Sequence, residues 1–125
     1  MNKEFIPYEQ ALELKKLGFD ENCIAFYEPD NKQVQVVGVE QRYNNPELLR
    51  IKDFCAPLYQ QAFRWFRDKH GLTSWVQEYT KDTFIYEIRP HVLSHYKEGE
   101  IYVYTTYEET EFACLKKLIE IVKKK

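Results

Sequence analysis

The feature that most constrains the fold is a helical phrase that the chain carries twice, once near each end. The first copy runs from Tyr8 to Phe19 and the second from Tyr107 to Ile119. Both begin with Tyr-Glu and both contain Leu-Lys-Lys-Leu, so apolar residues recur at helical spacing. Thr106 to Glu109 form a capping-box pattern before the second copy. We interpret the repetition as the common composition of amphipathic helices, and it predicts one helix near each end.

A third helix is predicted in the middle of the chain, from Ala56 to Lys69. At 100° per residue its apolar side chains fall in one arc and its polar side chains in the other. Pro57 suits a first helical turn, and His70-Gly71 suits a helix end, where positive charge and a left-handed residue are both favourable. The apolar arc consists of Leu58, Tyr59, Ala62, Phe63, Trp65 and Phe66.

The remaining apolar segments predict short strands, because they are β-branched or aromatic and most of them alternate. They span residues 23–27, 33–39, 75–79, 83–89 and 101–105. Residues 40–54 are polar and predict an irregular connection. The order α-β-β-α-β-β-β-α predicts an α+β fold, with a mostly antiparallel sheet and helices packed on one face.

Composition bounds the class of protein. The chain has 125 residues, 44% of them hydrophobic and 16% aromatic, which predicts a single domain over residues 1–125. A net charge of -2 disfavours a duplex-DNA binder, although single-strand binding through stacking needs only a local basic groove. The three cysteines, Cys23, Cys55 and Cys114, form no CxxC pair and are interpreted as buried thiols. With no apolar run of about 20 residues and no apolar h-region near the start, we expect a cytoplasmic protein outside membranes.

Three stretches together resemble a known group of small proteins. They run from Phe5 to Asp20, from Ala56 to Arg67 and from Thr106 to Ile119, at the beginning, middle and end of the chain. In these stretches the chain is similar to small α+β proteins of Bacteroidetes genomes and of the crAss-like and related phages that infect them. The resemblance implies a phage or mobile-element context, and it brings no activity, cofactor or catalytic residue.

The residue types that usually carry catalysis do not form a convincing set. Cys55 precedes the middle helix, whose N-terminus would favour a thiolate, and it could pair with His70, His91 or His95. No sequence signature surrounds it, so we prefer a buried thiol. His91 and His95 lack a third ligand, and Glu111 suits the first turn of the last helix as a solvated acid. We therefore assign no catalytic, metal or cofactor-binding residue.

The aromatic excess is the strongest lead to a function. Strand alternation places tyrosines and a neighbouring arginine on one face of the predicted sheet, where interfaces and stacked bases find their preferred partners. The alternative is that these tyrosines line the core with their hydroxyls at its rim. The candidate binding residues are Tyr79, Tyr86, Arg89, Tyr102 and Tyr104.

We consider three functions, in order of preference. The first is a non-enzymatic module that binds another protein, or a second copy of itself, through the open sheet face. The second is a single-stranded nucleic-acid binder that stacks bases on the tyrosines. The third is a cysteine-dependent enzyme.

Overall fold

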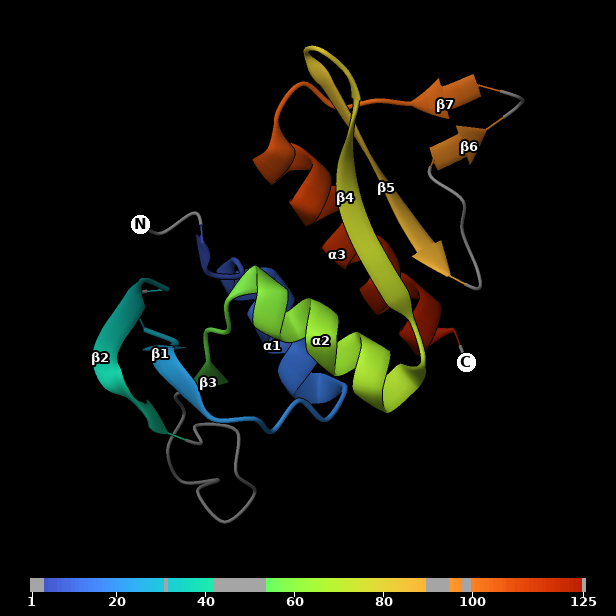
Figure 1. Ribbon diagram of the computed structural model, residues 1–125. Coiled ribbons are helices and arrows are strands. Elements are labelled where there is room, and N and C mark those ends of the chain that lie inside the picture. The colour runs from blue at the N-terminus through green and yellow to red at the C-terminus, as the bar shows by residue number, and fades with distance from the viewer. Residues whose placement is uncertain (1–3, 31, 42–53, 90–94, 98–99, 125) are drawn as a thin grey trace. The chain divides into compact units, whose positions relative to one another are not determined.

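The structure is a computed structural model that describes residues 4–30, 32–41, 54–89, 95–97 and 100–124; for 37–41, 95–97 and 100–102 it describes the backbone alone. The described elements, in chain order, are α1 (Tyr8–Lys16), β1 (Cys23–Tyr27), β2 (Val34–Gln41), β3 (Phe54–Cys55), α2 (Tyr59–His70), β4 (Thr73–Thr80), β5 (Thr83–Arg89), β6 (His95–Lys97), β7 (Glu100–Tyr102) and α3 (Tyr107–Lys123) (Figure 1). All strand pairings among them are antiparallel. The predicted α+β class and the antiparallel pairing are confirmed.

The strands are divided among three small sheets, in the orders β2-β1-β3, β4-β5 and β6-β7. Two of these strands, β3 and β6, were not predicted from the sequence. β3 lies at the end of the segment expected to be irregular, most of which falls outside the described residues. The predicted strand over 101–105 is β7 in its first part, and Tyr104 then forms an isolated bridge with Phe84 of β5.

Internal contacts divide the chain into two compact units, residues 1–61 and residues 62–125. We call them unit 1 and unit 2. The helix α2 begins in unit 1 and ends in unit 2. The prediction of a single domain over residues 1–125 stays a prediction.

Unit 1 is organised around aromatic rings between α1 and its sheet. The ring centroid of Tyr8 lies 5.5 Å from that of Tyr27 and 5.2 Å from that of Phe54. The buried Tyr27 hydroxyl donates a hydrogen bond to the Ile6 carbonyl at 2.7 Å. Because a buried hydroxyl needs a partner, this bond lets a tyrosine serve as a core residue here.

Helix α1 is terminated by a glycine in the left-handed conformation. Gly18 adopts a φ of 99°, which is costly for residues with a side chain. Its N–H donates to the Lys15 carbonyl at 3.1 Å, and the Phe19 N–H donates to the Leu14 carbonyl at 3.0 Å. These two bonds form a Schellman motif, and the Phe19 side chain that follows is buried.

The start of α2 differs by a few residues from the prediction. Residues 56–58 do not enter the helix, because backbone bonds hold them against neighbouring strands and the N-terminal segment. Ala56 N–H donates to the Ala25 carbonyl at 3.0 Å, and the Pro57 carbonyl accepts from Ile6 N–H at 2.9 Å. Pro57 therefore precedes the helix instead of lying in its first turn.

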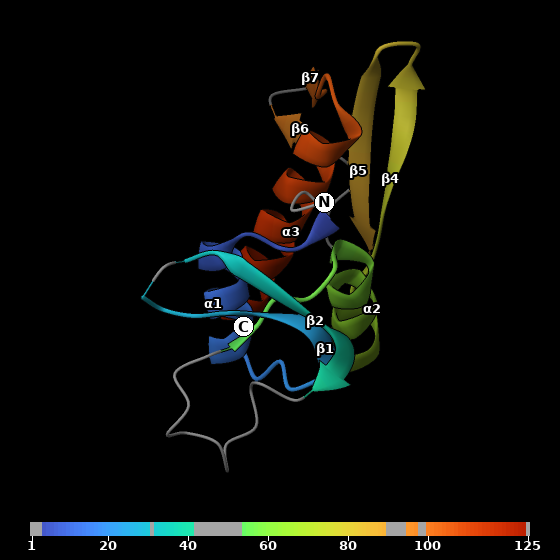
Figure 2. The ribbon, with the colours of Figure 1, turned by 90° about the vertical axis from the view of Figure 1, so that its left-hand side faces the viewer.

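Unit 2 consists mainly of the long β4–β5 hairpin packed against α3. The two views in Figures 1 and 2 agree that α3 runs along one face of this hairpin. The core of α3 is made by Cys114, Leu115, Leu118 and Ile119, all buried. These are four of the residues that the helical spacing assigned to its apolar arc.

The capping residue of α3 generates a test of the fold. The Thr106 hydroxyl accepts a hydrogen bond from the Glu109 N–H at 3.1 Å. We expect Thr106→Ala to lower the free energy of unfolding by about 1 kcal/mol, since an otherwise bonded N–H loses its partner. Urea denaturation followed by circular dichroism measures the change. Thr106→Ser keeps the hydroxyl and serves as the control, and an equal loss in both variants would contradict the capping role.

Candidate binding surface

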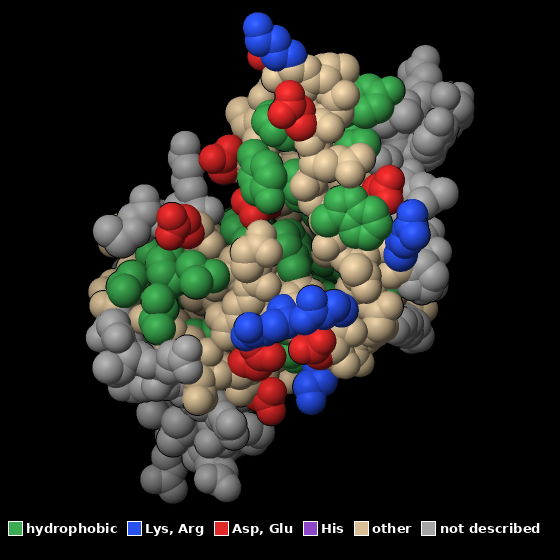
Figure 3. All heavy atoms as spheres, in the orientation of Figure 1, with side chains coloured by type: hydrophobic (Ala, Val, Ile, Leu, Met, Phe, Trp, Pro, Cys, Tyr) green, Lys and Arg blue, Asp and Glu red, His purple; other side chains and the backbone are tan. Residues whose placement is uncertain are grey.

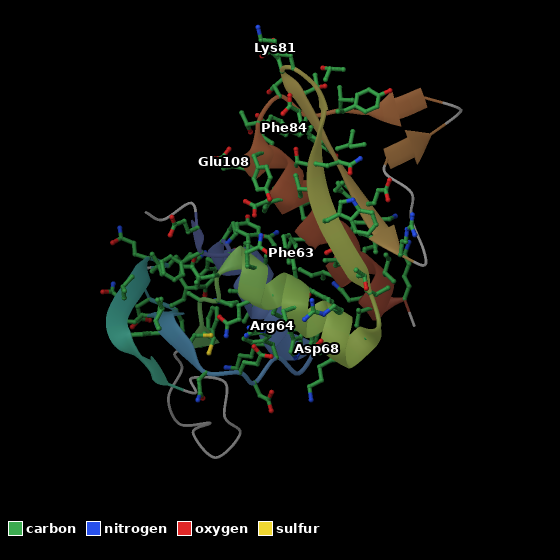
Figure 4. The ribbon with its side chains drawn as sticks, viewed as in Figure 1. Phe63, Arg64, Asp68, Lys81, Phe84 and Glu108 are labelled. Carbon is green, nitrogen blue, oxygen red and sulfur yellow. The ribbon has the colours of Figure 1, made fainter. Side chains whose placement is uncertain are left out.

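One face of the β4–β5 hairpin belongs to the core of unit 2. The Phe84 ring lies 6.0 Å from the ring of Tyr107 in the first turn of α3, in an edge-to-face arrangement. On β4, Ser74 pairs with Ile88 of β5. Burial raises the pKa of the Cys114 thiol of the same helix, and the nearness of Ser74 offsets part of that rise. Figure 4 shows Phe84 and Glu108 near the N-terminal end of α3, and Lys81 at the tip of the hairpin. We call this the inner face.

Tyr86 and Tyr104 lie on the inner face. Backbone bonds of 2.8 and 2.9 Å join Tyr104 to Phe84, so the Tyr104 side chain points to the same side of the sheet as that of Phe84. The Tyr86 ring stacks on Tyr104 at 6.4 Å between centroids, and Tyr86 is fully buried. Burial, followed by the nearby Tyr104, raises the pKa of the Tyr86 hydroxyl.

The opposite face of the hairpin presents a tryptophan and an arginine. Strand register pairs Trp75 with Glu87, and alternation puts Arg89 on the same side. The Arg89 guanidinium lies 5.4 Å from the centroid of the Trp75 ring and 4.0 Å from the Glu87 carboxylate. We call this the outer face; it consists of Thr73, Trp75, Gln77, Ile85, Glu87, Arg89 and Val103.

The outer face is exposed at Thr73, Gln77, Arg89 and Val103, whereas Trp75 and Glu87 are half-buried and Ile85 is buried. The Arg89 side chain is 65% exposed and Val103, which precedes Tyr104 and so alternates to this side, is 42% exposed. The Trp75 indole N–H donates to the Gln77 side-chain oxygen at 3.2 Å, which holds the ring across the strand. Figure 3 shows hydrophobic side chains on the visible face of this hairpin, with acidic and basic side chains beside them.

The five predicted binding residues therefore do not share one face. Arg89 lies on the outer face, and Tyr79, at the bulge near the hairpin turn, is 50% exposed. The Tyr102 side chain lies outside the described residues. Tyr86 and Arg89 stand three positions apart in one strand, so alternation separates them. The sequence reasoning missed Trp75, which the register of β4 against β5 brings beneath Arg89.

The residues considered for catalysis lie in different surroundings. Cys55 is fully buried in β3, and the His70 ring packs edge-to-face against Trp65 at 4.9 Å. His91 is outside the described residues, and His95 is described by its backbone alone. Glu111 lies close enough to Tyr107 to contribute, after burial, to the raised pKa of that hydroxyl. Over the ranges for which side chains are described, no three His, Cys, Asp or Glu residues are grouped as metal ligands would be.

Two further observations bear on function. Among the helices in the described ranges, none combines the length and the apolar character that a membrane span requires. Comparisons of the chain with known protein families, with curated proteins and with solved structures found no match. The functional argument therefore depends on the surface itself.

The buried thiol beneath the inner face generates a prediction about pH. Burial raises the pKa of Cys114 from 9.0 to about 12, so between these values the unfolded chain loses a proton that the folded chain keeps. The contribution of Cys114 to stability is full below about pH 9 and is lost as pH rises toward about 12. We expect the free energy of unfolding to fall by about 1.4 kcal/mol per pH unit in this window from Cys114 alone.

Urea denaturation across the window measures this slope, with Cys114→Ala as the comparison. The variant lacks the titrating group, so its free energy of unfolding should fall less steeply than that of the wild type. Equal slopes in the two proteins would show that the thiol is not held in its neutral form by burial.

Proposed function

We propose that the chain is a non-enzymatic protein-interaction module that binds its partner through the outer face of the β4–β5 hairpin. The observation that carries this proposal is the cation–π contact of the exposed Arg89 with the half-buried Trp75 on this face. Tryptophan and arginine are enriched among the residues that dominate binding energy at protein interfaces. The Trp75 indole is held in place by the Gln77 side-chain oxygen, so a partner would have little of this ring to order on binding.

The charge on the outer face supports a particular partner chemistry. The Arg89 guanidinium is largely exposed, and its ion pair with Glu87 is long, at 4.0 Å. The N–H groups of Arg89 can therefore donate hydrogen bonds to a second carboxylate. Val103 offers an exposed aliphatic contact on the same face. The partner we propose is a protein surface that places an Asp or Glu beside an apolar side chain.

The same features weigh against single-stranded nucleic acid as the partner. Base stacking needs accessible rings and a basic groove. Tyr86 is buried, and Arg89 is accompanied by the carboxylate of Glu87. The net charge of -2 gives no general attraction to phosphate.

The proposal includes a location. Three cysteines present as free thiols suit a reducing compartment, so we place the module in the cytoplasm. The resemblance to proteins of Bacteroidetes and their phages suggests that the partner belongs to such a host or to the infecting element.

Capture from a Bacteroidetes lysate, with and without nuclease, followed by affinity measurement with the captured protein, tests the proposal. We expect Trp75→Ala and Arg89→Ala each to weaken binding about tenfold or more, since each removes part of the stacked pair. Two controls remove exposed side chains outside the outer face, and the arginine control is close to Arg89 in exposure. Val36→Ala alters a residue that is 49% exposed in unit 1, and Arg67→Ala removes an arginine that is 55% exposed in α2.

The outcomes separate the alternatives. A partner that survives nuclease and depends on Trp75 and Arg89, but not on the control residues, supports the module. Capture that disappears with nuclease would move the assignment to nucleic acid. Self-association abolished by Trp75→Ala would identify the partner as a second copy, and equal binding by all four variants would overturn the surface.

A further inference from the structure

Two cysteines from distant parts of the sequence meet inside unit 1. The Cys55 thiol donates to the Glu21 carbonyl oxygen at 3.3 Å, and the Cys23 thiol donates to the same oxygen at 3.6 Å. Because both thiols donate to one oxygen, their sulfur atoms lie close together. Both residues are buried, and they lie on the neighbouring strands β1 and β3. Their sulfur atoms therefore share one small space.

Polar residues beside the two sulfurs reach the surface of unit 1. The Gln61 amide donates a hydrogen bond to the Asn22 carbonyl at 2.8 Å. Glu21 and Gln61 are half-buried and Asn22 is exposed, so a reagent that reaches the sulfurs would approach from this side. The interaction with Cys55, followed by burial, raises the pKa of Cys23, and the Gln61 amide offsets part of that rise. The pair therefore stays protonated and reacts slowly.

We propose that Cys23 and Cys55 are a site of reversible oxidation, at which a peroxide or a low-molecular-weight disulfide converts the two thiols into one intramolecular disulfide. With a peroxide, one thiolate attacks the O–O bond to give a sulfenic acid, and the second thiolate displaces water from that sulfur. In total, two thiols and one hydrogen peroxide give one disulfide and two waters. With glutathione disulfide, two thiols are oxidised and two glutathione thiols are released.

This inference concerns unit 1 and is independent of the proposed binding surface. The disulfide would close the chain between residues 23 and 55 into a covalent loop and fasten β1 to the segment that leads into α2. Such a closure restricts the unfolded chain, so the oxidised protein should be the more stable form. Cys114 lies in unit 2, buried among the residues of α3, and serves as an internal reference thiol.

The test uses the full chain, reduced and freed of reductant, then incubated with glutathione disulfide or hydrogen peroxide in native buffer. Unreacted thiols are trapped with N-ethylmaleimide after unfolding, and the intact mass and peptide map are recorded. Three cysteines minus the pair leave one, so we expect the oxidised wild type to carry a single adduct, on Cys114. Its midpoint of thermal unfolding should rise by on the order of 10 °C over the reduced form.

Three variants make the result specific. Cys114→Ser should still form the disulfide, whereas Cys23→Ser and Cys55→Ser should not and should show no rise in melting temperature. If either serine variant fails to fold, the corresponding alanine variant replaces it, and the wild-type peptide map remains decisive. Three adducts after oxidation, a lasting glutathione adduct on Cys23 or Cys55, or a disulfide that includes Cys114 would each overturn the proposal.

Discussion

The alternation of side chains along β5 is the constraint on which unit 2 depends. Phe84, Tyr86 and Ile88 face α3, and the residues between them face outward. A shift of one residue would turn Glu87 and Arg89 into the core and expose three apolar side chains. The backbone pair between Phe84 and Tyr104 helps to fix this register, because it adds a third segment along the edge of β5. The core and the outer face are thus two results of one strand pairing.

The helices could be predicted from the sequence because their signals are local. Apolar spacing, a glycine after α1 and a threonine before α3 each act within a few residues. The strands β3 and β6 were missed because they are two and three residues long, and β3 is moreover defined by its pairing with the distant strand β1. The same difficulty applies to the candidate site. Strand alternation separates Tyr86 from Arg89, but only the register of β4 against β5 places Trp75 beneath the guanidinium.

The abundance of tyrosine has more than one explanation, and it differs from residue to residue. Tyr27 belongs to the core of unit 1, where its hydroxyl reaches the Ile6 carbonyl. Tyr86 belongs to the core of unit 2, and Tyr79 is half exposed near the hairpin turn. Composition alone could not separate these roles, because each ring offers both an apolar body and a polar tip. The burial of each side chain distinguishes the core tyrosines from the exposed one. For this reason the proposed binding surface contains a tryptophan as its aromatic residue instead of a tyrosine.

The placement of the two tryptophans gives the chain its own optical probe. Trp65 is almost wholly buried, while Trp75 lies on the outer face under a cation. Indole emission shifts toward longer wavelength when the ring meets water, so the two residues contribute different bands to the spectrum. An event at the outer face changes the red-shifted band and leaves the blue-shifted band as an internal standard. Occupancy of this face can therefore be followed in the unlabelled protein.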